Sequence, residues 1–147
     1  MNAEVVLDGL VLGESPRWHD GRLWVADWAA HELVTLDAGG IRQVAEHPAS
    51  IPCCIDWLPD GRLLLVSGDR LLRREPDGTM VTHAELAQLD PHPWNDIAVD
   101  SQGNAFVGCI GFDSPPASTP RESSRWSPRR GTPGPPRGTS PSPTAWW

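Results

Sequence analysis

The chain has 147 residues, which suits one domain of ordinary size and is too short for two well-formed ones. Its net charge of −7 argues against a nucleic-acid-binding protein, and no apolar run approaches the ~18 residues of a transmembrane helix. The first residues show no basic stretch before an apolar core, and three cysteines do not suggest a disulfide framework. We therefore expect a cytoplasmic protein with neither membrane nor nucleic-acid partners.

The composition changes sharply near Asp113. Residues 1–113 contain 18 acidic residues and seven arginines, whereas residues 114–147 contain one acidic residue and five arginines. Nine of the 16 prolines lie in this last segment, which has no Val, Ile, Leu, Met or Phe and can bury almost nothing on folding. We therefore expect a folded part, 1–113, and a low-complexity tail, 114–147, that is disordered or read in a shifted frame.

Three segments of the folded part repeat a polar turn followed by a short apolar run. They are WHDGRLWVAD at 18–27, LPDGRLLLVS at 58–67 and DSQGNAFVGC at 100–109, and their glycines lie 40 and 42 residues apart. Apolar runs of this length, bounded by turn signals, predict buried strands.

Hairpins are predicted between these repeats. Segments 32–37 and 41–47 flank the turn Ala38-Gly39-Gly40, and segments 70–75 and 79–86 flank the turn Pro76-Asp77-Gly78. Each unit of about 40 residues then contains about four antiparallel strands, as in a β-propeller blade. A β-sandwich with evenly spaced turns is the alternative, but the repeat of residue types favours the propeller.

The predicted fold is therefore all-β, with two propeller blades and the first half of a third. A propeller closes a ring with about four to eight blades, so this number of strands cannot close one alone. An unclosed array leaves a blade face and a strand edge uncovered. We expect the isolated chain to aggregate rather than to form a stable propeller.

Three motifs resemble those of the senescence marker protein, gluconolactonase and luciferin-regenerating family. They are LGESPRW at 12–18, WNDIAVDSQGNAFVG at 94–108 and IGFD at 110–113, and the resemblance covers about residues 4–113. It implies a six-bladed propeller with a divalent metal ion, Ca²⁺ or Zn²⁺, in the central channel. It also implies hydrolysis of small-molecule substrates, the sugar lactones.

The resemblance assigns roles to four residues. Glu14 matches the family's metal-binding glutamate, and Asn95 matches a substrate-contacting asparagine. Asp96 and Asp113 are the further substrate-binding residues that it implies. Without the resemblance, Glu14 would be interpreted as a solvated turn residue and Asn95-Asp96 as a turn pair. Pro93 stands where relatives that bind sugar lactones often have an arginine, which argues against aldonolactone specificity.

The family's remaining metal ligands and its general base belong to later blades. They have no counterpart within the part of the chain that resembles the family, and a lone carboxylate holds a divalent ion poorly. We therefore assign no catalytic residue and expect a truncated, inactive chain.

The other residue types with known chemistry show no recognisable site pattern. The five histidines and three cysteines lack metal-ligand spacing, so we interpret them as surface or buried strand residues. The five tryptophans of the folded part are predicted to pack the blades, with Trp94 at the rim of the channel.

The tail leaves other functions open. The segment Pro133-Gly134-Pro135-Pro136 would suit a non-enzymatic binding module that docks partners, and arginines at 125–130 would suit nucleic-acid contact. A shifted frame is the third explanation: GTSPSPTAWW at 138–147 can be encoded so that the shifted reading gives DLAFPNGMV. Its Pro-Asn-Gly resembles the family's metal-asparagine motif, which predicts a one-base insertion or deletion between codons 112 and 138.

Overall fold

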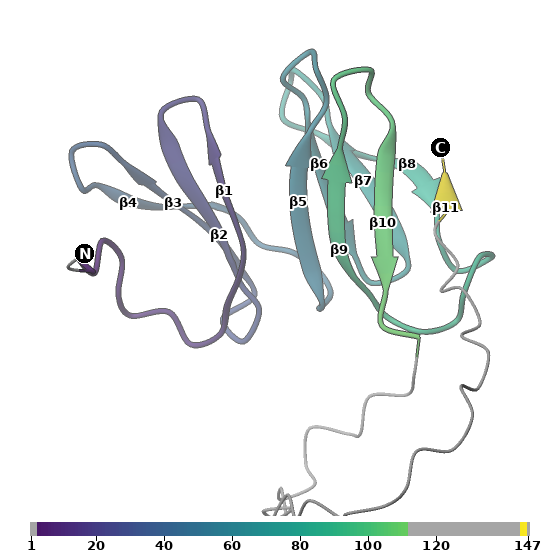
Figure 1. The fold of residues 1–147 in the computed structure, drawn as a ribbon, viewed down its shortest axis with the longest axis horizontal. Helices are drawn as coiled ribbons and strands as arrows, with labels where there is room; N and C mark the ends of the chain where they lie inside the picture. Colours follow the sequence, from purple (N-terminus) through teal and green to yellow (C-terminus); the bar gives the residue numbers. More distant parts are fainter. Residues whose placement is uncertain (1–2, 112–144, 147) are drawn as a thin grey trace, which may run out of the picture.

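The computed structural model describes residues 3–111 and 145–146, and these form three antiparallel sheets (Figure 1). The first sheet contains β1 (Gly13–His19), β2 (Arg22–Asp27), β3 (Glu32–Asp37) and β4 (Arg42–Glu46). The second contains β5 (Cys53–Trp57), β6 (Leu63–Ser67), β7 (Arg70–Arg74) and β8 (Met80–Glu85). The third contains β9 (Trp94–Val99), β10 (Ala105–Cys109) and the two-residue strand β11 (Ala145–Trp146).

The predicted all-β fold is confirmed. Strands β1 to β4 and β5 to β8 pair antiparallel in chain order, and β9 and β10 begin a third sheet of the same kind. The predicted hairpin turns end at Gly40 and Gly78, whose φ angles of 79° and 87° are strained for other residues. Strand β11 falls in the predicted tail, and the rest of residues 114–147 lies outside the described residues, as does Asp113.

The second sheet is buried on both faces, because the first and third sheets cover it. Alternate residues of a strand point to opposite sides, so its apolar residues divide into two sets. One set packs toward the first sheet, in a cluster formed by Ala26, Leu33, Cys53, Ile55, Leu63 and Leu65. The other set packs toward the third sheet, in a cluster that includes Cys54, Leu64, Val66, Ile97 and Val107. Two hydrophobic cores therefore hold three sheets together.

The tryptophans divide between these cores and the surface. Trp24, Trp28 and Trp57 pack against the cluster between the first two sheets, and the His19 ring stacks on Trp57 with centroids 4.1 Å apart. Trp94 also packs as predicted, between the second and third sheets, but its burial shows that it does not lie at a rim. The packing prediction was wrong for Trp18, which is 68% exposed.

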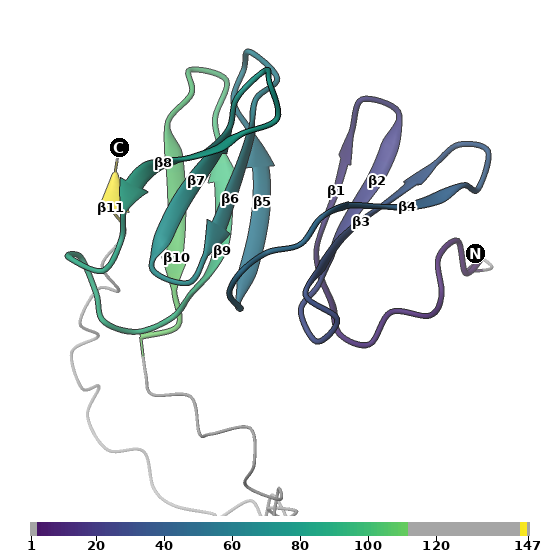
Figure 2. The ribbon, with the colours of Figure 1, turned by 180° about the vertical axis from the view of Figure 1, so that it is seen from behind.

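Strands β1, β5 and β9 are the first strands of their sheets; they lie side by side and run in the same direction (Figures 1 and 2). The Ile55 N–H donates to Ser15 Oγ at 3.1 Å, and the Val99 N–H donates to Asp56 Oδ2 at 2.7 Å. Each bond joins two sheets. Within the described part of the chain, no helix is long and apolar enough to cross a membrane.

Candidate functional site

Glu14 lies at the start of β1, where the pairing with β2 is irregular. Glu14 pairs with Ala26 and Arg17 with Trp24, so Ser15 and Pro16 form a bulge, and Ser15 has a φ of 51°. A bulge changes the direction in which the side chains of a strand point. Ser15 accepts its hydrogen bond from β5, while Glu14 is exposed.

Asn95 and Asp96 lie at the start of β9 and are also exposed. Asp96 pairs with Gly108 of β10. A Cβ atom at position 108 would lie 3.3 Å from Asp96 Cβ and 4.0 Å from Asn95 Oδ1. The glycine therefore leaves room for both side chains.

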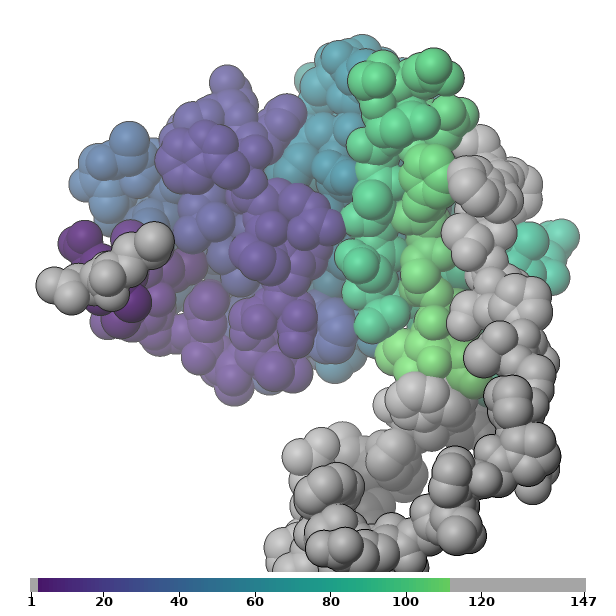
Figure 3. Space-filling model, viewed as in Figure 1, coloured from purple at the N-terminus to yellow at the C-terminus, as the bar shows by residue number. Residues whose placement is uncertain are grey.

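Arg17 connects the first and third sheets. Its Nη2 donates to the Ile97 carbonyl oxygen at 2.8 Å and lies 3.5 Å from Asp96 Oδ1. Asp96 is 72% exposed in its side chain, so this ion pair contributes little to stability, about 0–1 kcal/mol. Through these contacts the Arg17 side chain reaches from β1 to β9, and the first and third sheets meet on the face shown in Figure 3.

Three of the four predicted site residues lie at the same end of the first strands of the first and third sheets. Glu14 is the second residue of β1, and Asn95 and Asp96 are the second and third residues of β9. The fourth, Asp113, lies outside the described residues, and the roles of all four stay predictions. Arg17 was not assigned from the sequence, although it belongs to the same LGESPRW motif as Glu14.

A second cluster joins the loop between β8 and β9 to the end of β10. Asp90 Oδ1 accepts the His92 N–H at 2.8 Å and lies 2.6 Å from His92 Nδ1. The Cys109 thiol donates weakly to the His92 carbonyl oxygen at 3.7 Å. One ligand atom from each of these three residues lies within 4.8 Å of the others. This cluster was not predicted, because Cys109 lies 17 residues after His92 and meets it only through the pairing of β9 with β10.

The electrostatics of the acidic and thiol groups follow from these contacts. The His92 N–H and then its ring lower the pKa of Asp90 below its usual value. Burial raises the pKa of the Cys109 thiol, and the Asp90 carboxylate adds to this rise. Burial also raises the pKa of Cys53 to about 11 and that of Cys54 further, so neither buried thiol is an available nucleophile near neutral pH.

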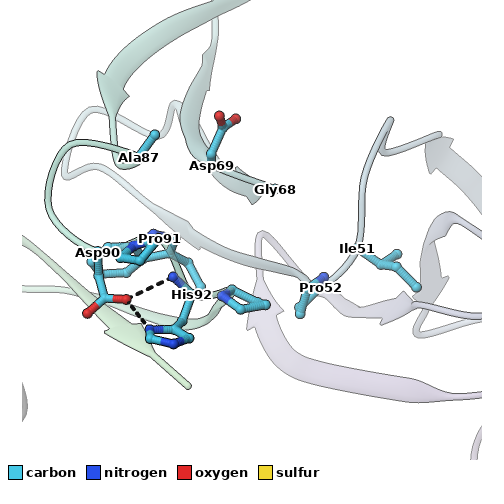
Figure 4. A pocket seen from close by; sticks show the side chains of 10 residues that line it. Ile51, Pro52, Gly68, Asp69, Ala87, Asp90, Pro91 and His92 are labelled. Carbon is cyan, nitrogen blue, oxygen red and sulfur yellow. Dashed lines mark hydrogen bonds and ion pairs between the residues drawn. The ribbon is translucent and has the colours of Figure 1, made fainter. Parts of the chain in front are cut away.

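A cavity of about 280 Å³ opens beside the second cluster (Figure 4). Asp90, His92 and Trp94 line it from the β8–β9 loop and β9, and Ile51, Pro52, Gly68 and Asp69 belong to its other walls. Trp94 is 1% exposed, and its Nε1–H has no hydrogen-bond partner in the part of the chain that the structure describes. A buried donor without a partner is costly, so this N–H is the polar atom near the cavity that most needs an acceptor.

The model of the SMP-30/gluconolactonase/LRE-like region matches residues 12–133. The chain belongs to this family. The match extends past Asp113, where the motifs recognised in the sequence end. Among curated proteins, none matches the chain.

One solved structure similar to this chain is the selenomethionine-substituted virginiamycin B lyase from Staphylococcus aureus. The TM-score is 0.52 at 13% sequence identity, and the match covers 68% of this chain and 35% of the lyase. At this identity the likeness concerns the fold alone, and it agrees with sheets that are blades of a β-propeller. The family member thus spans about a third of the lyase structure that it matches.

The family is generally metal-dependent, so the next question is which described residues could hold a metal ion. Among the described residues, Asp90, His92 and Cys109 are the only three His, Cys, Asp or Glu side chains close enough to hold an ion together. Glu14 belongs to no such group. A calcium site needs about six oxygen ligands, so the described residues do not complete the expected site around Glu14.

Proposed function

We propose that this family member is the N-terminal part of a sugar-lactone hydrolase, with its substrate at the start of strands β1 and β9. The observation that carries the proposal is the Arg17 bridge, which connects the strand bearing Glu14 with the strand bearing Asn95 and Asp96. Ligand sites in propellers need such convergence, because each blade contributes only a few side chains.

The roles follow from the chemistry of each side chain. The Asn95 amide is exposed and offers both a donor and an acceptor, which suits a sugar hydroxyl. Asp96 is held from two sides, because Arg17 lies 3.5 Å from Oδ1 and the Ile97 N–H donates to the same oxygen at 2.8 Å. A carboxylate fixed in this way accepts a hydrogen bond from substrate at little further entropic cost.

The chain of 147 residues is proposed to be inactive by itself. Glu14 supplies one metal ligand, and the described residues supply neither the other ligands nor a base beside a reacting atom. The remaining parts of the site would come from the blades that close the ring. The alternative of a partner-docking tail depends on residues outside the described part and stays a prediction.

The first test is an assay of the chain as it stands. Hydrolysis of δ-gluconolactone or of another simple lactone with added Ca²⁺, Zn²⁺ or Mn²⁺, measured as the release of protons, should not exceed the rate in buffer. Metal-stimulated turnover that disappears in Glu14→Gln would contradict the inactivity and would show that the ligand set is completed here.

The second test is the coding DNA between codons 112 and 147. We expect one inserted or deleted base whose correction opens a frame encoding further blades. The corrected protein should hydrolyse lactones, and Glu14→Gln should abolish this while Glu46→Gln, an acidic residue on the distant strand β4, should not. Stop codons through the alternative frame would refute the frameshift, and a corrected protein without activity would refute the proposed function.

A further inference from the structure

The geometry points to a zinc-type metal site formed by Asp90, His92 and Cys109, separate from the site that the family resemblance implies at Glu14. Asp90 and His92 belong to the loop between the second and third sheets, and Cys109 ends β10. Their side chains are neither fully exposed nor fully buried, so an ion can enter from solvent.

The donor set selects the class of metal. One carboxylate, one imidazole and one thiolate form the mixed oxygen, nitrogen and sulfur set that Zn²⁺ and Co²⁺ accept, whereas Ca²⁺ and Mg²⁺ prefer oxygen alone. Three protein ligands leave the fourth tetrahedral position open. Two of the three residues line the cavity of about 280 Å³, which leaves room for a water or another ligand there.

The distances are close to those of a loaded site. Tetrahedral zinc places neighbouring nitrogen and oxygen ligands about 3.3 Å apart and nitrogen and sulfur ligands about 3.6 Å apart. The Asp90 Oδ1–His92 Nδ1 contact of 2.6 Å has to lengthen by about 0.7 Å to reach this separation. All three ligand atoms lie within 4.8 Å of one another, so side-chain rotation has to bring the more distant ones closer. On binding, the thiol of Cys109 loses its proton to solvent and a metal–sulfur bond forms.

The backbone holds the three residues in place before any ion binds. The His92 N–H donates to Asp90, which fixes the short turn between them. The Ile110 N–H donates to the Pro93 carbonyl oxygen at 2.9 Å, which holds the end of β10 against the loop. The register of β9 and β10 shifts between Gly108 and Cys109, so that Cys109 pairs with Trp94 beside this loop.

Trp94 lines the same cavity as Asp90 and His92, and its buried Nε1–H has no hydrogen-bond partner among the described residues. A water or another oxygen acceptor would give this donor a partner.

The test uses Co²⁺ as a spectroscopic substitute for zinc, titrated into the full chain under reducing conditions. We expect one equivalent to produce a thiolate-to-cobalt charge-transfer band and the d–d absorption of a tetrahedral site, and Zn²⁺ to displace it. Cys109→Ser should remove the charge-transfer band. His92→Gln should weaken binding by more than the ~10–100-fold that loss of an outer-shell partner costs.

Two matched variants separate this site from others. Glu14→Gln should leave the spectrum unchanged, and so should His83→Gln, which removes an exposed histidine of β8. Circular dichroism checks that each variant folds. If one of Cys109→Ser and His92→Gln has a folding defect, the other still decides the test. Absence of the charge-transfer band, or its persistence in Cys109→Ser, would overturn the inference. Neither readout depends on lactone hydrolysis, so the failure of one proposal leaves the other standing.

Discussion

The first and second sheets have the same four-stranded topology, yet they differ in what covers them. The second sheet has apolar neighbours on both faces, and all five residues of β6 are buried. The first sheet packs one face on β5 and β6, while Val5, Val6 and Trp18 on its other side are 81%, 66% and 68% exposed. The same blade pattern therefore produces a core element in one position and an open surface in the other.

This difference indicates that the blades of a propeller do not contribute equally to its stability. An interior blade is stabilised by two neighbours and a terminal one by a single neighbour, as in other repeat architectures. Side-chain deletions should therefore cost most in the second sheet, and less where the first sheet faces solvent.

The largest effect should come from Leu64→Ala in the middle of β6. Leu64 is fully buried between the second and third sheets, so the cavity should cost about 2–5 kcal/mol of unfolding free energy. The matched change Leu12→Ala removes the same atoms from a side chain that is 47% exposed and should cost within about 0.5 kcal/mol. Urea unfolding curves measure both, and equal losses would contradict the comparison.

The next effect concerns Asp27, a buried carboxylate that fastens the N-terminal segment to the first sheet. Asp27 accepts the N–H groups of Val11 and Leu12 at 2.8 and 2.9 Å. Asp27→Ala leaves both donors unpaired and should cost about 2 kcal/mol. Asp37→Ala also removes a carboxylate that accepts two backbone N–H groups, those of Gly39 and Ile41, but in an exposed turn. It should cost under about 1 kcal/mol in the same urea titration.

Acid should weaken this attachment selectively. Burial alone would raise the pKa of Asp27, but the bonds from Leu12, Val11 and Ala30 more than offset it and leave the pKa below its usual value. The stabilisation is therefore fully present above the unfolded pKa of about 3.9 and is lost as the pH falls through the folded pKa. Unfolding free energies measured from about pH 6 downward should fall less steeply in Asp27→Asn. Identical slopes would show that Asp27 does not carry this dependence.

A smaller loss is expected where the first two sheets are joined. Ser15→Ala removes the acceptor of the Ile55 N–H and should cost about 1 kcal/mol, seen as a lower melting temperature. Ser101→Ala, which removes a hydroxyl from an exposed turn, serves as the control. If the melting temperature of Ser15→Ala equals that of the unchanged chain, this bond does not hold the sheets together.

The smallest effect on stability, but a clear one on association, should come from Trp18→Arg. Trp18 lines an apolar groove of about 570 Å³ with Val5, Val6, Leu23 and Leu36. An uncovered groove of this kind favours association between chains. Light scattering should show a higher monomer fraction in Trp18→Arg. Gln102→Arg, which adds the same charge in an exposed turn, should leave the monomer fraction unchanged.

The strands and their order were predictable because the turns carry a local signal. Glycines 21, 61 and 103 adopt φ angles of 71°, 83° and 89°, and the apolar runs after them are the second strands of the three sheets. The double burial of the second sheet was not predictable, because a continuous apolar run such as LLLVS does not say what covers each face.

The site was predictable only where residues share a motif. Glu14, Asn95 and Asp96 were found through their motifs, whereas the contact of Arg17 with β9 depends on how the sheets pack. The cluster of Asp90, His92 and Cys109 depends on the register shift before Cys109. No regular spacing along the chain encodes such a shift, because a bulge changes which residues face each other.

Because β1, β5 and β9 run in the same direction, their starts lie at one end of the molecule and the turns after them at the other. We expect the end with the turns to tolerate insertions better than the end with the strand starts. The tight turns at residues 20–21, 60–61 and 102–103 follow β1, β5 and β9, at the end opposite Glu14 and Asn95 (Figure 1). A peptide tag or a fluorescent label inserted there lengthens an exposed connection and leaves the strand starts untouched. These turns are therefore the natural places to attach reporters or tethers to this chain.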